Sequence, residues 1–303
     1  MHVPRDAAGS PRRSSPRTIH GAGPTASIGR AGKLTVDYVN DGTRTVFART
    51  NARTPWHLLP PIYLDESGAA YTLLLNPSGG LVGGDHLSID MRLGSEAHVL
   101  ISTPSANRVY RSSKDDSVQD IEIRLGPGAV LEWVPEATIP FAGSRFHQSI
   151  HVTLGQGATL LLWDAIAAGR IACGERWAFT SLTNDIRITT ASGSSLIERY
   201  DLSSATEPGC VGLASEWDYV ASLFMVGEEV GDDLWSRLEN ELAEILDRHP
   251  GLVLGGVSRP EISGLAVKLV ARSAPDLAAT CDALWTAIRR TLWGLPPVAL
   301  RKY

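Results

Sequence analysis

The sequence predicts a mostly β protein, an irregular β-helix-like stack of strand–turn–strand units with two C-terminal α-helices. Three observations support this fold class. Apolar and polar residues alternate from Lys33 onward, which is the two-residue period of a strand. A strand–turn–strand unit then recurs through the middle of the chain, and two late segments change to the helical period of about 3.6 residues.

The first expected element is a hairpin. The segments LTVDYV and TRTVFART both alternate, and Asn40, Asp41 and Gly42 lie between them. These three residue types favour tight hairpin turns because they tolerate positive φ values. We therefore expect two antiparallel strands at the start of the ordered chain.

Four similar units follow the hairpin. Their turn glycines are 32 residues apart from Gly94 to Gly126 and 29 apart from Gly126 to Gly155. A period of roughly 20–50 residues is typical of stacked units that share one core. The uneven spacing favours an irregular β-helix or layered sheets, and a β-sandwich of ordinary hairpins stays open. The units are LSIDMRLGSEAHVLIS from Leu87, IEIRLGPGAVLEWV from Ile121, IHVTLGQGATLLLW from Ile150 and IRITTASGSSLIERY from Ile186.

Two segments are predicted to be helices, near residues 232–249 and 274–293. In the first, leucine and isoleucine recur at three- and four-residue spacing before a His-Pro-Gly stop. In the second, Ser273 can cap, Pro275 suits the first turn, and Gly294 ends the helix. The segment ISGLAVKLVARS between them is predicted to be a returning strand.

Residues 1–30 differ in composition from the rest of the chain. They are rich in Arg, Ser, Pro and Gly and have almost no large apolar side chains, so we predict a disordered tail. No apolar segment follows Arg12-Arg13, and we therefore expect no export signal. Residues 31–303 are predicted to form a single β domain.

Composition limits the function classes. The net charge of −5 argues against a general nucleic-acid binder, which would carry a basic excess. No run approaches the roughly 18 apolar residues of a membrane span. The three cysteines lie far apart without a CxxC pair. That pattern suggests a reducing compartment, which we take to be the cytoplasm, and no cysteine metal site.

The segment NPSGGLVGGDHL, residues 76–87, holds four glycines in twelve residues. A phosphate loop would need a Gly-Lys-Ser/Thr ending and a following helix, whereas this segment ends in Asp85 and continues into a strand pattern. Calcium would need more oxygen ligands than Asp85 and Asp90 supply. We interpret the glycines as structural turn residues that let the backbone bend between strands: Gly79, Gly80, Gly83 and Gly84.

Two other residue pairs are only weak indications of a metal site or a catalytic site. His147 and His151 fall in a strand pattern, about 13 Å apart along the chain, and are interpreted as half-exposed residues rather than metal ligands. Glu132 and Glu136 flank Trp133, as the two carboxylates of a glycosidase could. A proline between them disturbs the strand, and a solvated pair is the favoured interpretation.

Several motifs together resemble those of a known family. NPSGGLVGGDHLSID followed by STPSANRVYRS resembles the signature of the urease accessory protein family UreD, also called UreH. LEWVPEATIPF (residues 131–141) and DAIAAGRIACGERW (residues 164–177) are similar to further family stretches in the same order. The resemblance extends from about Lys33 to Trp293.

The resemblance implies a β-helix-like fold with two helices and an accessory role without catalysis. Proteins of this family join UreF and UreG in a complex on apo-urease. Nickel released from the GTPase UreG is thought to pass through an internal tunnel to the buried urease active site, whose lysine is carbamylated. The expected partners are therefore UreF, UreG and apo-urease, with transient Ni²⁺, no tightly bound cofactor, and neither nucleic acid nor membrane.

A nickel conduit needs weak oxygen ligands, because a closed high-affinity site would trap the ion. The path-lining candidates are Glu175, Asp164, Asp85 and Thr103, and a structural role is favoured for Asp85. Asp164 and Glu175 bracket the loop at Arg170 and could instead form one ion-pair network with it.

Partner-binding candidates are Arg108, Tyr110 and Arg111, a cationic and aromatic cluster of the kind that anchors interfaces. Trp293 on the second helix is a further candidate, although core packing is the favoured interpretation of that residue. The rival function is a β-helical carbohydrate-active enzyme or carbohydrate-binding protein, which would need an aromatic groove with two facing carboxylates. A purely structural β-repeat protein is the third possibility.

Overall fold

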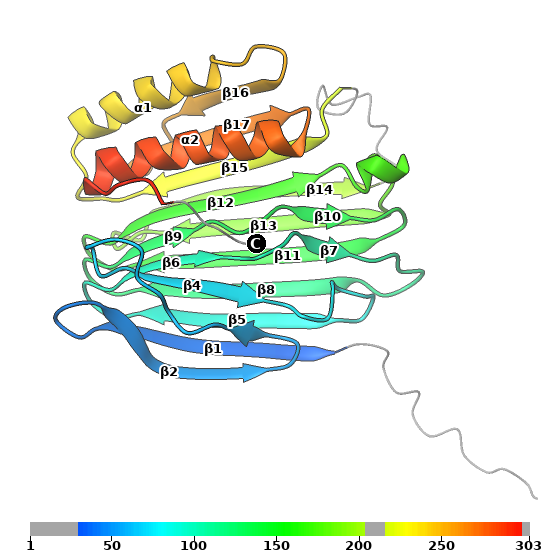
Figure 1. The fold of residues 1–303 in the computed structure, drawn as a ribbon, viewed down its shortest axis with the longest axis horizontal. Helices are drawn as coiled ribbons and strands as arrows, with labels where there is room; N and C mark the ends of the chain where they lie inside the picture. The colour runs from blue at the N-terminus through cyan, green and yellow to red at the C-terminus, as the bar shows by residue number, and fades with distance from the viewer. Residues whose placement is uncertain (1–29, 204–215, 299–303) are drawn as a thin grey trace, which may run out of the picture.

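The structure is a computed structural model that describes residues 30–203 and 216–298. Its strands form two sheets, and two helices lie along one end of the second sheet (Figure 1). The predicted tail, residues 1–30, falls outside the described residues apart from Arg30.

The seven-stranded sheet contains the first strand of each repeated unit and also the second strand of the fourth unit. Its order is β14-β13-β11-β8-β5-β1-β2. The strands are β1 (Ala31–Asn40), β2 (Thr45–Arg53), β5 (His86–Leu93), β8 (Ser117–Leu125), β11 (Arg145–Leu154), β13 (Ser181–Thr189) and β14 (Ser195–Ser203).

The ten-stranded sheet has the order β16-β17-β15-β12-β9-β6-β4-β3, with β7 and β10 beside this path. Its strands are β3 (His57–Leu58), β4 (Ala70–Leu75), β6 (His98–Ser102), β7 (Asn107–Val109), β9 (Val130–Trp133), β10 (Thr138–Pro140), β12 (Thr159–Ala167), β15 (Tyr219–Val226), β16 (Val253–Ser258) and β17 (Gly264–Ala271). The helical elements are α1 (Asp232–Leu246), α2 (Ala274–Trp293) and the 3-10 turn η1 (Ile171–Cys173).

Three of the four repeated units are coils of a solenoid. β5, β8, β11 and β13 pair in parallel in one sheet, while β6, β9 and β12 pair in parallel in the other. The two strands of each of these units therefore lie in different sheets, and the chain crosses at the glycine turn. A Cβ added to Gly126 would lie 2.9 Å from the backbone of Gly94, and one added to Gly155 would lie 2.9 Å from that of Gly126. The turns stack so closely that only glycine fits, which confirms the β-helix-like prediction.

The fourth unit is an ordinary hairpin. β13 and β14 pair antiparallel within the seven-stranded sheet, so this unit ends the stack of coils. At the other edge, β1 and β2 form the antiparallel hairpin that the Asn40–Gly42 turn predicts. The parallel coils are therefore closed by a hairpin at each side.

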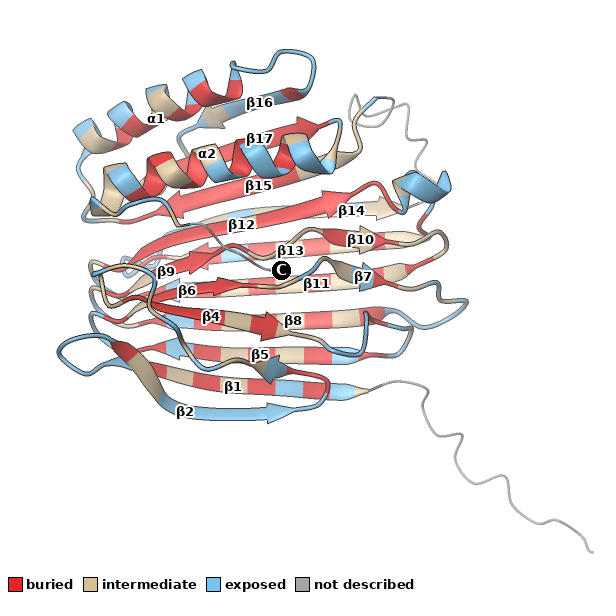
Figure 2. Cartoon of the chain, viewed as in Figure 1, coloured by how far each residue is buried: buried red, intermediate tan, exposed pale blue. Residues whose placement is uncertain are grey.

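The burial of a strand residue depends on whether the other sheet or a helix covers the face of the sheet on which the residue lies (Figure 2). Strands of the seven-stranded sheet alternate between buried and partly exposed residues, as in β11, because their outer face meets solvent. β12, β15 and β17 are buried almost throughout, since the helices cover the outer face of the second sheet there. One apolar cluster fills the space between the sheets, and a second lies between the ten-stranded sheet and the helices.

The two helices begin at the predicted residues. α1 ends at Leu246, three residues before the predicted boundary at 249, and buries Trp235 with its leucine stripe. In α2 the Ser273 hydroxyl accepts a hydrogen bond from the Asp276 amide, and Gly294 ends the helix with a φ of 65°. The strand expected between them is β17, which lies between β15 and β16 in the sheet.

A buried charge cluster attaches α2 to the solenoid. Glu132 on β9 and Arg289 on α2 have 0% and 1% exposed side chains and form an ion pair. Glu132 also accepts a hydrogen bond of 2.6 Å from Trp285 Nε1 and lies 2.8 Å from His98 Nε2. Arg289 donates in addition to Asp65 at 2.6 Å. The interpretation of Glu132 as a solvated residue is therefore wrong, because α2 covers the face on which it lies.

Replacing Arg289 by alanine is expected to lower the free energy of unfolding by about 3–5 kcal/mol, because it leaves Glu132 buried without its cation. Urea denaturation measures this change. The control is Arg290→Ala, which removes an exposed ion pair with Glu241 and should cost less than about 1 kcal/mol. Equal effects of the two substitutions would contradict a special role for the buried pair.

Candidate functional site

The glycine-rich segment lies flat against the segment around β7. A Cβ added to Gly80 would lie 2.5 Å from the Arg108 carbonyl oxygen, and one added to Gly83 would lie 2.1 Å from a nearby serine hydroxyl. Gly79 and Gly84 have φ values of 84° and 85°, which side chains disfavour. A backbone that approaches this closely leaves no room for a ligand inside the turn itself.

Asp85 closes this segment through an ion pair. Its side chain is fully buried and lies 2.7 Å from the Arg30 guanidinium. It also accepts hydrogen bonds from the Arg30 amide at 2.9 Å and the Val82 amide at 3.0 Å. Burial alone would raise the pKa of Asp85, but these donors outweigh burial and hold the pKa below its usual value. The carboxylate thus ties the start of β1 to the glycine-rich segment.

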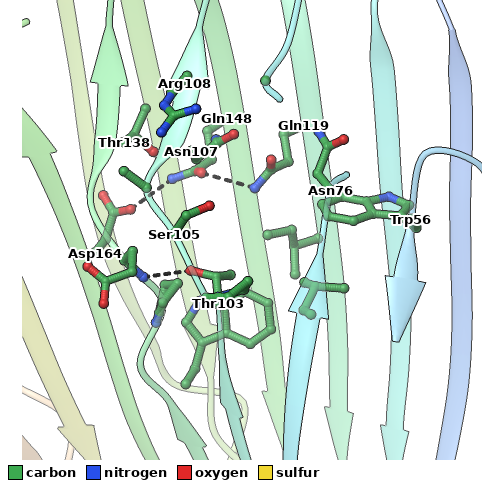
Figure 3. Close-up of a pocket in the computed structure, with 18 of the residues that line it drawn as sticks. Trp56, Asn76, Thr103, Ser105, Asn107, Arg108, Gln119, Thr138, Gln148 and Asp164 are labelled. Atoms are coloured by element: carbon green, nitrogen blue, oxygen red, sulfur yellow. Dashed lines mark hydrogen bonds between the residues drawn. The ribbon is translucent and has the colours of Figure 1, made fainter. Parts of the chain in front are cut away.

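A pocket of about 90 Å³ lies beside this segment, between the two sheets (Figure 3). Its lining combines apolar residues with several amide and hydroxyl side chains. The polar residues of the lining include Asn76, Thr103, Asn107, Gln119, Gln148 and Asp164.

Gln148 on β11 is the centre of a buried hydrogen-bond cluster. Its Nε2 donates to Asp164 Oδ1 at 3.0 Å and to Asn184 Oδ1 at 3.1 Å, and its Oε1 accepts from Gln119 Nε2 at 3.4 Å. Asn184 and Tyr200 both donate to Asp164 Oδ2, at 2.9 Å and 3.3 Å. Each of the two sheets contributes to the cluster, since Asp164 lies on β12 and the others on the facing sheet.

Burial has the largest influence on the titration of Asp164. Burial raises the pKa of this carboxyl, and the hydrogen bonds from Gln148, Tyr200 and Asn184 oppose burial without cancelling it. The pKa of Tyr200 is also raised, by burial and then by the nearby Asp164. The cluster offers carbonyl, carboxyl and hydroxyl oxygens. Oxygen groups of this kind are weak ligands for a divalent metal.

Thr103 lies at the same pocket, where its hydroxyl accepts a hydrogen bond of 2.9 Å from the Glu136 amide. Two of the four path-lining candidates, Asp164 and Thr103, therefore line one pocket. Asp85 and Glu175 do not line it.

Glu175 belongs to a separate surface cluster. It pairs with Arg170 and accepts a hydrogen bond of 3.0 Å from the Ala142 amide. These donors, Arg170 first, lower the pKa of Glu175 to about 2. Arg170 also stacks over the Phe141 ring at 4.4 Å. The alternative of one ion-pair network holds for Arg170 and Glu175. It does not include Asp164, because β12 directs Asp164 into the interior while Glu175 lies in the loop after η1.

The partner-binding candidates lie in two places. Arg108 and Arg111 are exposed, and the Tyr110 hydroxyl donates to the Gly79 carbonyl at 3.1 Å. Tyr110 also meets the Phe141 ring edge-on at 5.0 Å. Trp293 is half-buried and packs against His98 with ring centroids 5.8 Å apart, so part of its surface is used in packing.

The polar cluster includes residues that the sequence analysis missed. Gln119 and Gln148 each stand seven residues before a turn glycine, Gly126 and Gly155, and they pair directly in the parallel register. A polar residue at the same place in two successive repeats was therefore a usable signal. Asn184 joins this row through its pairing with Gln148, but nothing in its local sequence marks it.

Comparison with known proteins identifies the family. A family model described as "UreD urease accessory protein" matches residues 30–302. The chain belongs to the UreD family. It is 33% identical over 276 residues to the urease accessory protein UreD of Alkalilimnicola ehrlichii, which covers 89% of this chain and 90% of that one. It is 32% identical to UreD of Deinococcus radiodurans (92% and 99% covered) and 31% identical to UreD 2 of Streptomyces griseus (91% and 95% covered).

Membership of the UreD family supports a role in urease maturation as an accessory protein. Within the described part of this UreD chain, no three His, Cys, Asp or Glu side chains are grouped so that they could hold a metal ion. No described helix is long and apolar enough to cross a membrane.

Replacing Asp85 by asparagine is expected to destabilise the fold at neutral pH by about 1–3 kcal/mol, because Arg30 loses its partner. The folded-state pKa of Asp85 lies below the ordinary value of 3.8. The stabilisation is therefore fully present above about pH 4 and is lost as the pH falls through the folded-state pKa. Urea denaturation from about pH 3 to pH 6 should show the wild type approaching the variant at low pH. A constant difference between the two proteins would contradict this assignment.

Proposed function

We propose that this UreD-family chain holds UreF and UreG against apo-urease and passes nickel through its interior toward the urease active site. The observation that carries the nickel step is the buried polar cluster of Gln148, Asp164 and Asn184 beside the pocket. Polar groups inside an apolar core are costly unless they are paired, so their concentration between the sheets supports a passage for a partly hydrated ion.

The chemistry of the cluster suits transfer rather than storage. Ni²⁺, the cargo, would meet amide, hydroxyl and carboxyl oxygens instead of a closed set of histidines or thiolates, so it would bind weakly. Burial raises the pKa of Asp164, and an arriving dication would favour the ionisation of this carboxyl. Binding and release would then be coupled to a proton on this one carboxyl.

The surface near the pocket supports the scaffold part of the proposal. Arg108 and Arg111 are exposed beside the half-buried Tyr110, and Arg and Tyr are the residue types that most often anchor interfaces. We assign UreF, UreG or urease to this face as the docking partner.

The carbohydrate-active alternative finds no support in the carboxylates. Glu132 is one of the two carboxylates that a glycosidase interpretation of the sequence would use, and it is buried in an ion pair with Arg289. A glycosidase acid must instead face its substrate.

Reconstitution tests the assigned role. A tagged form of this chain, expressed with UreF, UreG and apo-urease, is expected to purify as a complex. Urease activity and nickel content should then rise only when this chain is present. Activation that is unchanged when the chain is omitted would contradict the proposal.

The nickel route is tested by Asp164→Asn, which keeps the size of the side chain and removes the ionisable group. At limiting nickel we expect roughly tenfold less nickel in urease, as loss of a metal-directed group commonly gives, with complex assembly unchanged. The control is Asp185→Asn on β13, where the aspartate pairs with Arg199 on the outer face. Wild-type nickel loading by Asp164→Asn would remove this carboxyl from the route.

A further inference from the structure

Lys268 lies on the same face of the ten-stranded sheet as Asp164. Ser222 on β15 pairs directly with Asp164 on β12, and Lys268 on β17 pairs directly with Ser222. Directly opposite residues of antiparallel strands share a face, and neighbouring strands lie about 4.8 Å apart. Asp164, Ser222 and Lys268 therefore form one polar row that faces the space between the sheets.

The lysine side chain bends back along this row toward Asp164. Its Nζ donates a hydrogen bond of 2.9 Å to the Ser222 hydroxyl, and Ser222 lies buried between the two charged residues. The positive charge reaches Asp164 from this position, where it lowers the pKa of the carboxyl and so opposes the effect of burial.

Two further contacts hold the ammonium in place. Glu198 on β14 forms an ion pair with Lys268, and the Phe224 ring lies 5.0 Å from its Nζ. Glu198 and Tyr200 are two residues apart on β14 and so share a face, and Tyr200 donates a hydrogen bond to Asp164. The facing sheet therefore contacts both charged residues of the row through one strand.

Stability alone gives Lys268 little reason to be in this row. Its side chain is 46% exposed, and an ion pair with that exposure contributes little to the free energy of unfolding. The position of the ammonium beside the buried pocket carboxyl is the feature with a chemical consequence.

We propose that Lys268 is a positioning residue that limits how tightly a divalent cation binds at Asp164. This role rests on the proposed nickel route and concerns the same carboxyl. A dication that reaches Asp164 is attracted by the carboxylate and repelled by the ammonium held at Ser222. The repulsion weakens binding and favours release, as a site that passes its cargo onward requires.

Calorimetric titration of the purified full chain with nickel chloride tests this role. Lys268→Met removes the charge and keeps the length of the side chain. It is expected to bind Ni²⁺ roughly tenfold more tightly than the wild type, because a like charge near the dication is gone. Lys268→Arg keeps the charge and should bind like the wild type. Damage to the fold would not raise the affinity, so a gain separates electrostatic repulsion from a structural role.

Asp164→Asn places the effect at this carboxyl, since it should weaken nickel binding and abolish the gain when combined with Lys268→Met. The matched control is Lys33→Met, which removes an exposed lysine on β1 and should leave the affinity unchanged. Thermal unfolding checks that each variant is folded.

The outcomes separate this role from the route itself. If Asp164→Asn weakens binding while Lys268→Met binds no more tightly than the wild type, the role of Lys268 is overturned and the route stands. If Asp164→Asn binds nickel like the wild type, the cation does not use this carboxyl, and the route and the role of Lys268 fail together.

Discussion

The parallel register of the coils is the constraint on which the rest of the structure depends. It places each inward residue beside its equivalent in the next coil, so whole rows share one environment. One row is entirely apolar and buried, with Ile89, Ile121, Ile150 and Ile186 in direct register. A slip of one residue would turn every such row to the outer face. The apolar residues of each strand therefore have to alternate in the register that the stacked glycine turns set.

The same register creates the polar interior. Two residues before the isoleucine row, the order of equivalent residues is Leu87, Gln119, Gln148 and Asn184. An amide side chain in such a row has the neighbouring residues of the row as its nearest hydrogen-bond partners. Asp164 on the facing sheet accepts further hydrogen bonds from Gln148 and Asn184. The pocket lies along this row, with Gln119, Gln148 and Asp164 in its lining.

The Glu132–Arg289 ion pair holds α2 on the outer face of the ten-stranded sheet. α2 could slide along an apolar sheet face at little cost, since hydrophobic burial is not directional. Pairing the buried guanidinium with Glu132 and Asp65 defines one position of the helix on the sheet. That position also sets Trp293 against His98, so the surface near the end of α2 depends on the same buried charges.

The sequence by itself determined the local elements: the first hairpin, the repeated strands, both helices, the caps of the second helix, and the UreD motifs. The hydrophobic period, the turn residues and the helix caps each depend on a few neighbouring residues, so they can be predicted without a structure. Only the tertiary structure decided that three repeats cross between sheets while the fourth closes as a hairpin. It also decided that Glu132 is buried under α2 and that Asp164 is separated from Glu175. These outcomes depend on which distant strand or helix covers a given face, and alternation states only that a face is covered.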